Sequence, residues 1–253
     1  MAIDPALSAL AANTESTEPW ARPSCPNCRS GYIGFAEPSE DESHESAPHH
    51  GHEAFEPDWI RGTFVIRGQC ENRECQLAVH GTGDYFVDYS TQQVDFDSPG
   101  PLYSSYYKLT HLHPPMLLMP IPKSAPEEIR EGVLRASRVL FADPGLAATA
   151  LRATVERFLT AEGVTGGPSG KFQTADVRIK QWSAQDPTRL AVANLLLAVK
   201  WLGNAGTHED ADLTTTEVLE GAAMLDEAFH RVYTGPDLDA RAQVINTAKG
   251  PSR

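Results

Sequence analysis

The stretch "HLHPPMLLMPIPKSAP", residues 111–126, separates two parts of the sequence that have different patterns. Five of its sixteen residues are proline, so it can continue neither a strand nor a helix. Segments before it, such as "GTFVIRGQC" and "LYSSYYKL", are rich in the β-branched and aromatic residues that favour strands. Segments after it repeat apolar residues at helical spacing. We therefore predict an α+β fold in which a β domain precedes an all-α domain.

The domain bounds follow from this change of pattern. We predict a small β domain at residues 23–110, a proline-rich linker at 111–125 and a bundle of four or five helices at 126–235. Residues 1–22, which are rich in Ala, Ser, Thr and Glu, are expected to form a disordered leader, and residues 236–253 a weakly helical tail.

Three helix starts in the second half have capping patterns. Ser124-Ala-Pro-Glu127 and Thr214-Thr-Thr-Glu217 match a capping box, and Asp143 precedes a proline at the first helical position. These patterns predict where the helices of the bundle begin.

The net charge of −13 is unevenly distributed. Residues 37–58 contain eight acidic residues and no Lys or Arg, so the rest of the chain carries only −5. This balance argues against wholesale wrapping of nucleic acid and leaves room for a local basic face. The N-terminus does not match a secretory signal, and no apolar run reaches the ~18 residues of a membrane span. We expect a soluble cytoplasmic protein with no membrane partner.

The four cysteines form two close pairs, Cys25-Pro-Asn-Cys28 and Cys70-Glu-Asn-Arg-Glu-Cys75. Two such turns can present four thiolates to one tetrahedral Zn²⁺ ion. The 41 residues between the pairs fall to 19 when the acidic insert 37–58 is removed, which is within the range typical of such sites. We predict a zinc ribbon with structural zinc on all four cysteines, and a solvated loop at the insert. The alternatives are unligated thiols or a redox pair.

Four histidines lie in the same acidic insert. They are His44, His49, His50 and His52, and in a Ser- and Pro-rich loop they are typical of a solvated run. A metal-handling role for this loop is one hypothesis for the function, besides the two given below. His111 and His113 are expected to be ordinary linker residues.

The stretch "WLGNAGTHED", residues 201–210, ends a strongly apolar helix. At helical spacing Asn204 and His208 face the same way, and such a pair could serve acid–base chemistry or bind a phosphate. The structural alternative is also open, because Gly203 and Gly206 allow close helix packing or a left-handed helix stop.

The order of several motifs resembles the bacterial domain-of-unknown-function family 4145. These motifs are "CPNC", the second cysteine pair, an aromatic-rich strand segment, "HLHPP", "LRATVERFL" and "WLGNAGTHEDAD". The resemblance covers roughly Cys25 to Tyr233. That family is similar to the helical HEPN superfamily (higher eukaryotes and prokaryotes nucleotide-binding) of toxins and antiviral defence proteins, so the resemblance implies a HEPN-like helical domain that pairs as a homodimer.

The resemblance also implies an active-site pattern of Arg-Asn followed by His. Asn204 and His208 match the last two positions, but Gly203 stands where that pattern has Arg. A metal-independent ribonuclease needs a cation for the developing phosphorane charge. We therefore expect a non-catalytic interaction or nucleic-acid-associated module, with a protein or RNA partner, in a defence or restriction system. The alternative is an endoribonuclease that uses His208 with Lys200 or Arg231 as its cation.

Overall fold

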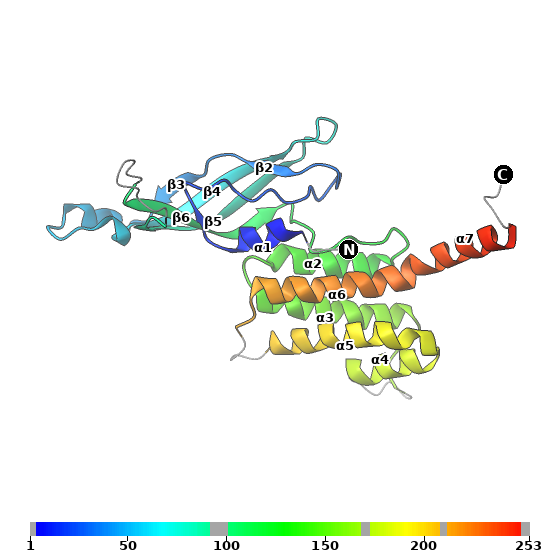
Figure 1. Cartoon of the computed structure of the whole chain (residues 1–253). Helices are drawn as coiled ribbons and strands as arrows, with labels where there is room; N and C mark the ends of the chain where they lie inside the picture. Colours follow the sequence, from blue (N-terminus) through cyan, green and yellow to red (C-terminus); the bar gives the residue numbers. More distant parts are fainter. Residues whose placement is uncertain (1–3, 92–100, 168–172, 208–211, 249–253) are drawn as a thin grey trace. The chain divides into compact units, whose positions relative to one another are not determined.

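The protein consists of two units, as the change of sequence pattern predicts. The computed structural model describes residues 4–91, 101–167, 173–207 and 212–248. The sheet unit comprises residues 4–116, and the helical unit begins at Leu117. Figure 1 shows strands in the first unit and helices in the second, which confirms the predicted α+β class.

The sheet unit contains one antiparallel sheet with the strand order β1-β6-β5-β4-β2, and β3 pairs with the edge of β4. β4, β5 and β6 are the long strands, and Figure 1 shows them curving along their length. The strands are β1 (Thr14–Glu15), β2 (Ile33–Phe35), β3 (Ser39–Glu42), β4 (Arg61–Cys70), β5 (Ala78–Tyr89) and β6 (Tyr103–His113).

One face of the three long strands is buried and the other is exposed. In β4 the burial alternates strictly from Phe64 on, with residues 64, 66, 68 and 70 buried and residues 65, 67 and 69 exposed. Period-two alternation of this kind puts every second side chain on the same face. The buried inner face is made of Phe64, Ile66, Val79, Tyr85, Tyr107, Leu109 and Leu112.

The leader is ordered where the structure describes it, so the prediction of disorder is wrong for residues 4–22. Helix α1 (Pro5–Ala11) begins at Asp4, whose carboxylate accepts hydrogen bonds from the backbone N–H groups of Ala6 and Ser24. Strand β1 pairs with β6. Trp20 packs into the inner face, with its ring centroid 5.8 Å from those of Phe64 and Tyr107.

A buried carboxylate fastens the leader to the sheet. Glu15 is 2 % exposed and accepts hydrogen bonds from the hydroxyls of Ser90 (2.6 Å) and Thr91. Burial raises the pKa of Glu15, but these hydrogen bonds outweigh it and lower the pKa to about 2. A few well-placed contacts therefore order a segment whose composition is that of a disordered one.

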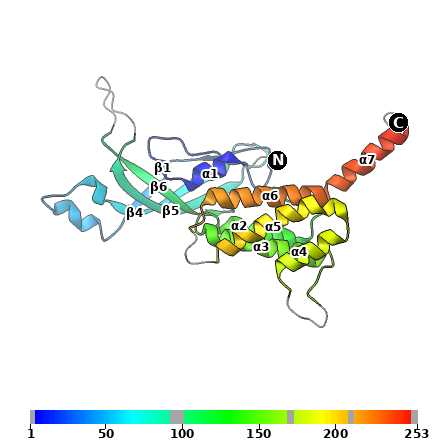
Figure 2. The ribbon, with the colours of Figure 1, turned by 60° about the horizontal axis from the view of Figure 1, so that its bottom comes forward.

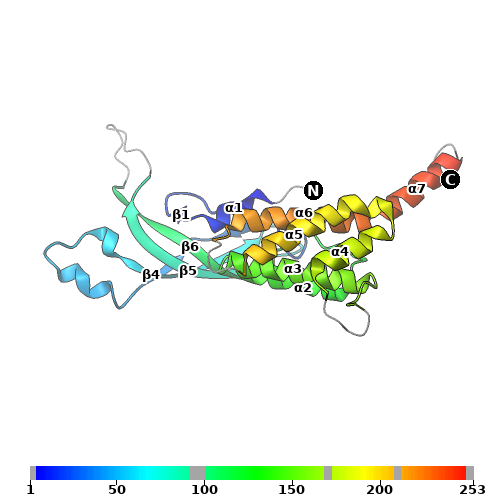
Figure 3. The same ribbon diagram turned by 90° about the horizontal axis from the view of Figure 1, so that it is seen from below.

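The acidic insert also differs from the predicted solvated loop. Strand β3 lies inside it and pairs with Gly62–Val65 of β4. The carboxylate of Glu40 accepts a hydrogen bond from the Tyr107 hydroxyl at 2.7 Å. The 3-10 helices η1 (Ala47–Gly51) and η2 (Pro57–Trp59) follow, and Figure 3 shows this segment extending beyond the end of β4. The insert is an extension of the sheet edge, because β3 uses backbone hydrogen bonds that need no apolar side-chain pattern.

The helical unit is built around α3. Helix α3 packs against α2, α5 and α6, and α4 packs against α5. Figure 2 shows α7 continuing past the end of α6. The α-helices described in this unit are α2 (Glu127–Val139), α3 (Pro144–Ala161), α4 (Ala175–Ala184), α5 (Leu190–Ala205), α6 (Thr215–Tyr233) and α7 (Gly235–Ala248), and the 3-10 helix η4 (Pro187–Arg189) precedes α5.

Two of the three predicted helix caps are present. Thr214 and Glu217 form the capping box of α6, and Asp143 accepts the Leu146 N–H at 2.8 Å. Ser124 does not cap α2, which begins after Pro126 without a side-chain cap. Its hydroxyl donates instead to the backbone carbonyl of Tyr233.

The predicted linker at residues 111–125 is largely packed structure. Strand β6 continues into it as far as His113. Within the helical unit, the Leu118 N–H donates to the buried Ser137 hydroxyl of α2 at 3.3 Å. Proline ends β6 but does not prevent the next residues from packing, because an extended chain can bury apolar side chains without regular hydrogen bonding.

Substituting Trp20→Ala should destabilise the sheet unit by about 2–4 kcal/mol, because an aromatic ring that covers the inner face is lost. In scanning calorimetry the transition of the sheet unit should move down by ~8 °C or more. Trp59→Ala is the matched control, since Trp59 is 38 % exposed, and its transition should move much less. Equal shifts for the two variants would show that the leader is not anchored through Trp20.

Candidate metal centre

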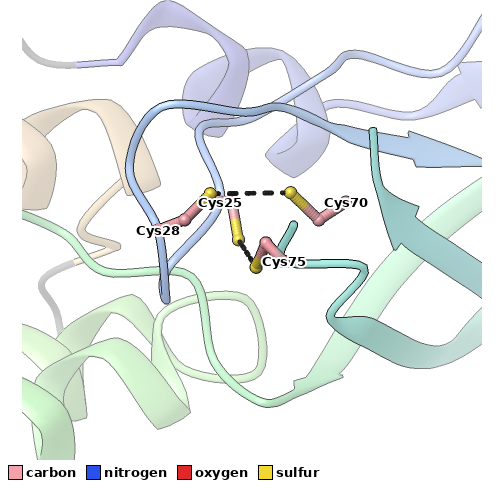
Figure 4. Close-up of side chains that lie close together, drawn as sticks. All are labelled: Cys25, Cys28, Cys70 and Cys75. Carbon is pink, nitrogen blue, oxygen red and sulfur yellow. Dashed lines mark hydrogen bonds between the residues drawn. The ribbon is translucent and has the colours of Figure 1, made fainter. Parts of the chain in front are cut away.

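The four cysteine sulfurs meet at one point of the sheet unit. The Sγ atoms of Cys25 and Cys75 are 3.7 Å apart, as are those of Cys28 and Cys70, and all four lie within 4.8 Å of one another. Figure 4 shows the four side chains pointing toward a common centre. A tetrahedron with metal–sulfur bonds of ~2.3 Å has edges of about 3.8 Å, so this spacing fits one metal ion.

Strand pairing brings the two cysteine pairs together. The first pair precedes β2, Cys70 ends β4, and Cys75 lies in the turn that leads to β5. Ile33 of β2 is the register partner of Cys70. Residues that are 42 positions apart in the sequence therefore become neighbours because the antiparallel ladder sets their register.

Both turns contain one residue in the left-handed backbone conformation. The residue after the second cysteine of each pair is left-handed, with φ 56° at Arg29 and φ 48° at Gln76. The N–H of Arg29 donates to the Cys25 carbonyl at 3.1 Å, and the N–H of Gln76 donates to the Asn72 carbonyl at 3.0 Å. Each left-handed residue reverses the chain, so both cysteines of a pair can point to the same side.

Gly31 permits the close approach of the first turn to Cys70. A Cβ atom at this position would lie 2.8 Å from the Cys70 sulfur and 2.9 Å from the Cβ of Asn72. The Gly31 carbonyl accepts the N–H of Cys25 at 2.8 Å. Any larger residue here would push the two turns apart.

The surroundings favour thiolate at Cys28 and Cys75 and disfavour it at Cys70. A hydrogen bond from Ser30 lowers the pKa of Cys28 to about 6, and the Asn27 side chain, 3.4 Å from the Cys75 sulfur, lowers the pKa of Cys75. Burial raises the pKa of Cys70 to about 12. Amide donors at the sulfurs are typical of metal thiolates, since they orient the ligands and disperse their charge.

The histidines of the acidic insert do not join a comparable group. Within the described ranges, the one cluster of three or more potential metal ligands consists of the four cysteines. His49 and His52 pack on Trp59, with ring centroids 5.5 and 5.6 Å apart. His50 stacks on Phe55 and pairs with Glu42. His111 and His113, expected in the linker, lie on β6 and are exposed.

The corner after α5 is described as far as Thr207, and His208 lies outside the described residues. The Asn204 carbonyl accepts hydrogen bonds from the N–H and hydroxyl of Thr207. Lys200 is 8 % exposed and its ammonium lies 3.1 Å from the Trp201 ring centroid. Arg231 is paired with Glu227 at 2.7 Å.

Gly203 packs closely against α3 of the same chain. A Cβ atom at this position would overlap the Cβ of Arg152 and lie 2.8 Å from the Ala148 carbonyl oxygen of α3. Of the two structural alternatives, close packing is the one observed, because Gly206 has a right-handed φ of −63° and lies against Gly145. Arg152, which the sequence did not single out, is thereby placed beside the end of α5.

Two family models match this chain. Residues 134–248 match a domain of unknown function, DUF4145. Residues 12–111 match a second domain of unknown function, DUF8608. The resemblance predicted from the sequence is therefore confirmed for most of the helical unit, whereas the four cysteines lie in the region matched by the second family.

Further comparisons add no named relative. No curated protein and no solved structure matches the chain. Among the described residues, none of the helices combines the length and the apolar character that a membrane crossing requires.

We predict one tightly bound metal ion per chain. Elemental analysis after exhaustive dialysis should give about one equivalent, and Cys75→Ser should lose most of it because a thiolate ligand is removed. Acidification should also release the metal, since protons compete for the thiolates. The double variant His49→Ala/His52→Ala is the control and should keep its metal. A metal-free protein whose sheet unit is fully folded would refute the prediction.

Gly203→Leu should destabilise the helical unit by about 3 kcal/mol or more, because neither α3 nor α5 can move apart without losing its packing. Urea unfolding measures the change. Ala191→Leu adds the same side chain at an exposed position of α5 and should change the stability by less than about 0.5 kcal/mol. If Gly203→Leu alters only the association state, α5 contacts a second chain at this glycine instead.

Proposed function

We propose that the chain is a non-catalytic, nucleic-acid-associated interaction module whose sheet unit is held by structural zinc. The observation that carries this proposal is the compact group of four cysteine sulfurs, which lie within 4.8 Å of one another and include two pairs at 3.7 Å. Four thiolates complete a tetrahedron and leave no position for a reactive water, so such a centre supports folding rather than catalysis.

Zinc is the metal that this donor set suits best. Tetrahedral sulfur sites in proteins hold Zn²⁺ or iron, and Zn²⁺ tolerates the geometry without any preference from its d electrons. The paired turns with their left-handed residues support a zinc-ribbon arrangement. Elemental analysis distinguishes the two metals, and Co²⁺ substitution should give the absorption bands of a tetrahedral tetrathiolate.

The helical unit supplies the second part of the proposal. The match of residues 134–248 to DUF4145 supports a HEPN-like bundle and, through that resemblance, a place in a bacterial defence or restriction system. Leu190 and Trp201 on α5 are 62 % and 59 % exposed. Exposed apolar residues on one helix support the prediction of a homodimer through the helical unit.

Binding and cleavage assays on the same samples test this function. The full chain with its metal should bind random-sequence RNA or DNA in the micromolar range, and binding should weaken steeply with added salt. It should leave the RNA intact in the presence of chelator. Absence of binding to every nucleic acid would refute the nucleic-acid part of the proposal while leaving structural zinc untouched.

A second candidate function is supported by one specific contact. A metal-independent endoribonuclease of HEPN type would use His208 for acid–base chemistry and would need a nearby cation. Lys200 is buried against Trp201, whereas Arg152 touches Gly203, is about one-third exposed and forms an ion pair with Glu156 at 3.3 Å. Arg152 is therefore the cation that this alternative would use, in place of Lys200 or Arg231.

The alternative predicts chelator-resistant RNA cleavage that both His208→Ala and Arg152→Ala reduce by at least about 100-fold. Arg138→Ala, which removes an exposed arginine from α2, is the control and should cleave like the unmodified chain. If the unmodified chain shows no cleavage above background, the non-catalytic proposal stands and the alternative is rejected.

A further inference from the structure

The outer face of the sheet is defined by the register of its three long strands. Residues directly opposite one another in β4, β5 and β6 form rows that run across the sheet. Because alternate residues share a face, the rows that contain the exposed odd-numbered residues of β4 lie on the outer face. These rows are Arg67–His80–His113, Val65–Thr82–His111, Thr63–Asp84–Lys108 and Arg61–Phe86–Tyr106.

This outer face is open to solvent along the sheet. Val65 at its centre is 58 % exposed, and the side chains of Arg67, His80 and His113 are all exposed. The inner face, in contrast, is covered by Trp20 and Phe35. The backbone of β5 is hydrogen-bonded on both sides, so the outer face can recognise a partner only through its side chains.

Cationic and imidazole side chains gather at one end of the outer face. Arg67, His80 and His113 are direct cross-strand neighbours, and His111 and Lys108 follow on β6. In the described part of the chain neither Arg67 nor Lys108 forms an ion pair, although the chain has thirteen excess acids. The acids on this face are Asp84, Asp88 and, on the neighbouring β3, Asp41. Two further acids lie at its ends and already have partners. Glu15 is opposite Tyr106 and accepts hydrogen bonds from Ser90 and Thr91, and Glu71 lies beside Gly34 and pairs with Arg22.

Aromatic rings occupy the other end of the same face. Phe86 and Tyr106 stack with ring centroids 5.4 Å apart and an interplanar angle of 16°. The guanidinium of Arg61 lies 5.4 Å from the Phe86 ring centroid. Both rings are half-buried. Arg61 and Tyr106 flank the Phe86 ring from the two neighbouring strands, so the stack presents ring edges to solvent.

We propose that this outer face binds a short segment of single-stranded nucleic acid, with phosphates at the Arg67–His80–His113 end and a base against the exposed ring edges of the Arg61–Phe86–Tyr106 row. The two rows are six residues apart along β4, a span of about 20 Å that a few extended nucleotides can cover. Cations along the backbone and aromatic platforms for bases are the two elements of single-strand recognition. The proposal deepens the proposed function and rests on its nucleic-acid part.

The arrangement favours a single strand over other polyanions. A duplex presents its bases inside grooves, which an element that projects from the protein must enter, and a sheet face does not project. In a single strand the bases are unstacked and can reach aromatic rings. An acidic peptide would satisfy the cations but would leave the aromatic stack without a role.

Fluorescence anisotropy of a labelled 12-nucleotide RNA with the full, metal-containing chain tests the proposal. Arg67→Glu/Lys108→Glu should weaken binding more than tenfold, and Arg67→Ala/Lys108→Ala should reduce the salt slope by about 1.4, which is two phosphate contacts on a single strand. Asp84→Asn should tighten binding about twofold, because it removes an acid beside Lys108. Arg135→Glu/Arg138→Glu makes the same charge change on exposed positions of α2 and should bind within twofold of the unmodified chain.

The outcomes separate this proposal from the function on which it rests. If the unmodified chain binds the RNA but the Arg67 and Lys108 variants bind equally well, the outer face is not the site and the proposed function survives. If the unmodified chain binds neither RNA nor single-stranded DNA, both fail. If an oligoglutamate peptide competes as well as the RNA does, the face binds an acidic protein segment instead, and the proposal is overturned.

Discussion

Four cysteine sulfurs in contact are the constraint on which the sheet unit depends. As thiolates they repel one another, so the group is stable only around a cation that offsets their charge. The two turns that carry them also end β4 and lead into β2 and β5. The left-handed backbone at Arg29 and Gln76 has a structural purpose only if both pairs face one centre. A metal ion at this point would therefore fix the ends of three strands, from which the long sheet extends.

The helical unit depends on a different constraint, which is close packing around α3. Gly203 lets α5 approach so near to α3 that the Arg152 side chain lies directly against the glycine. This contact explains why the stretch after Leu202 contains small residues without invoking chemistry. It also places the Arg152 side chain against Gly203, the position at which the family resemblance expects a cation. The packing contact thus coincides with the position that the ribonuclease alternative would use, and assays on Arg152 and His208 distinguish the two roles.

The two units suggest a division of tasks within one chain. The sheet unit has a cluster of four cysteines and an open face with cations at one end and stacked rings at the other. The helical unit has exposed apolar residues on α5 that suit association with another copy. Pairing through helices would double the number of sheet faces available to one nucleic acid, and linked sites bind more tightly than separate ones. The strongly negative remainder of the chain would then confine binding to those faces.

The sequence by itself determined the features that rest on local chemistry. The two cysteine pairs predicted the group of four sulfurs that the fold brings together, the change from β-like to helical periodicity predicted the two units, and Thr214 with Glu217 predicted the start of α6. The sequence wrongly predicted disorder around Trp20 and a solvated loop around Glu40. The contacts that order these two residues come from residues far away in the chain. Only the tertiary structure decided that Arg67, His80 and His113 share a row and that Arg152 lies beside Gly203. Strand register and helix crossing depend on long-range packing, and no local pattern encodes which distant side chains will meet.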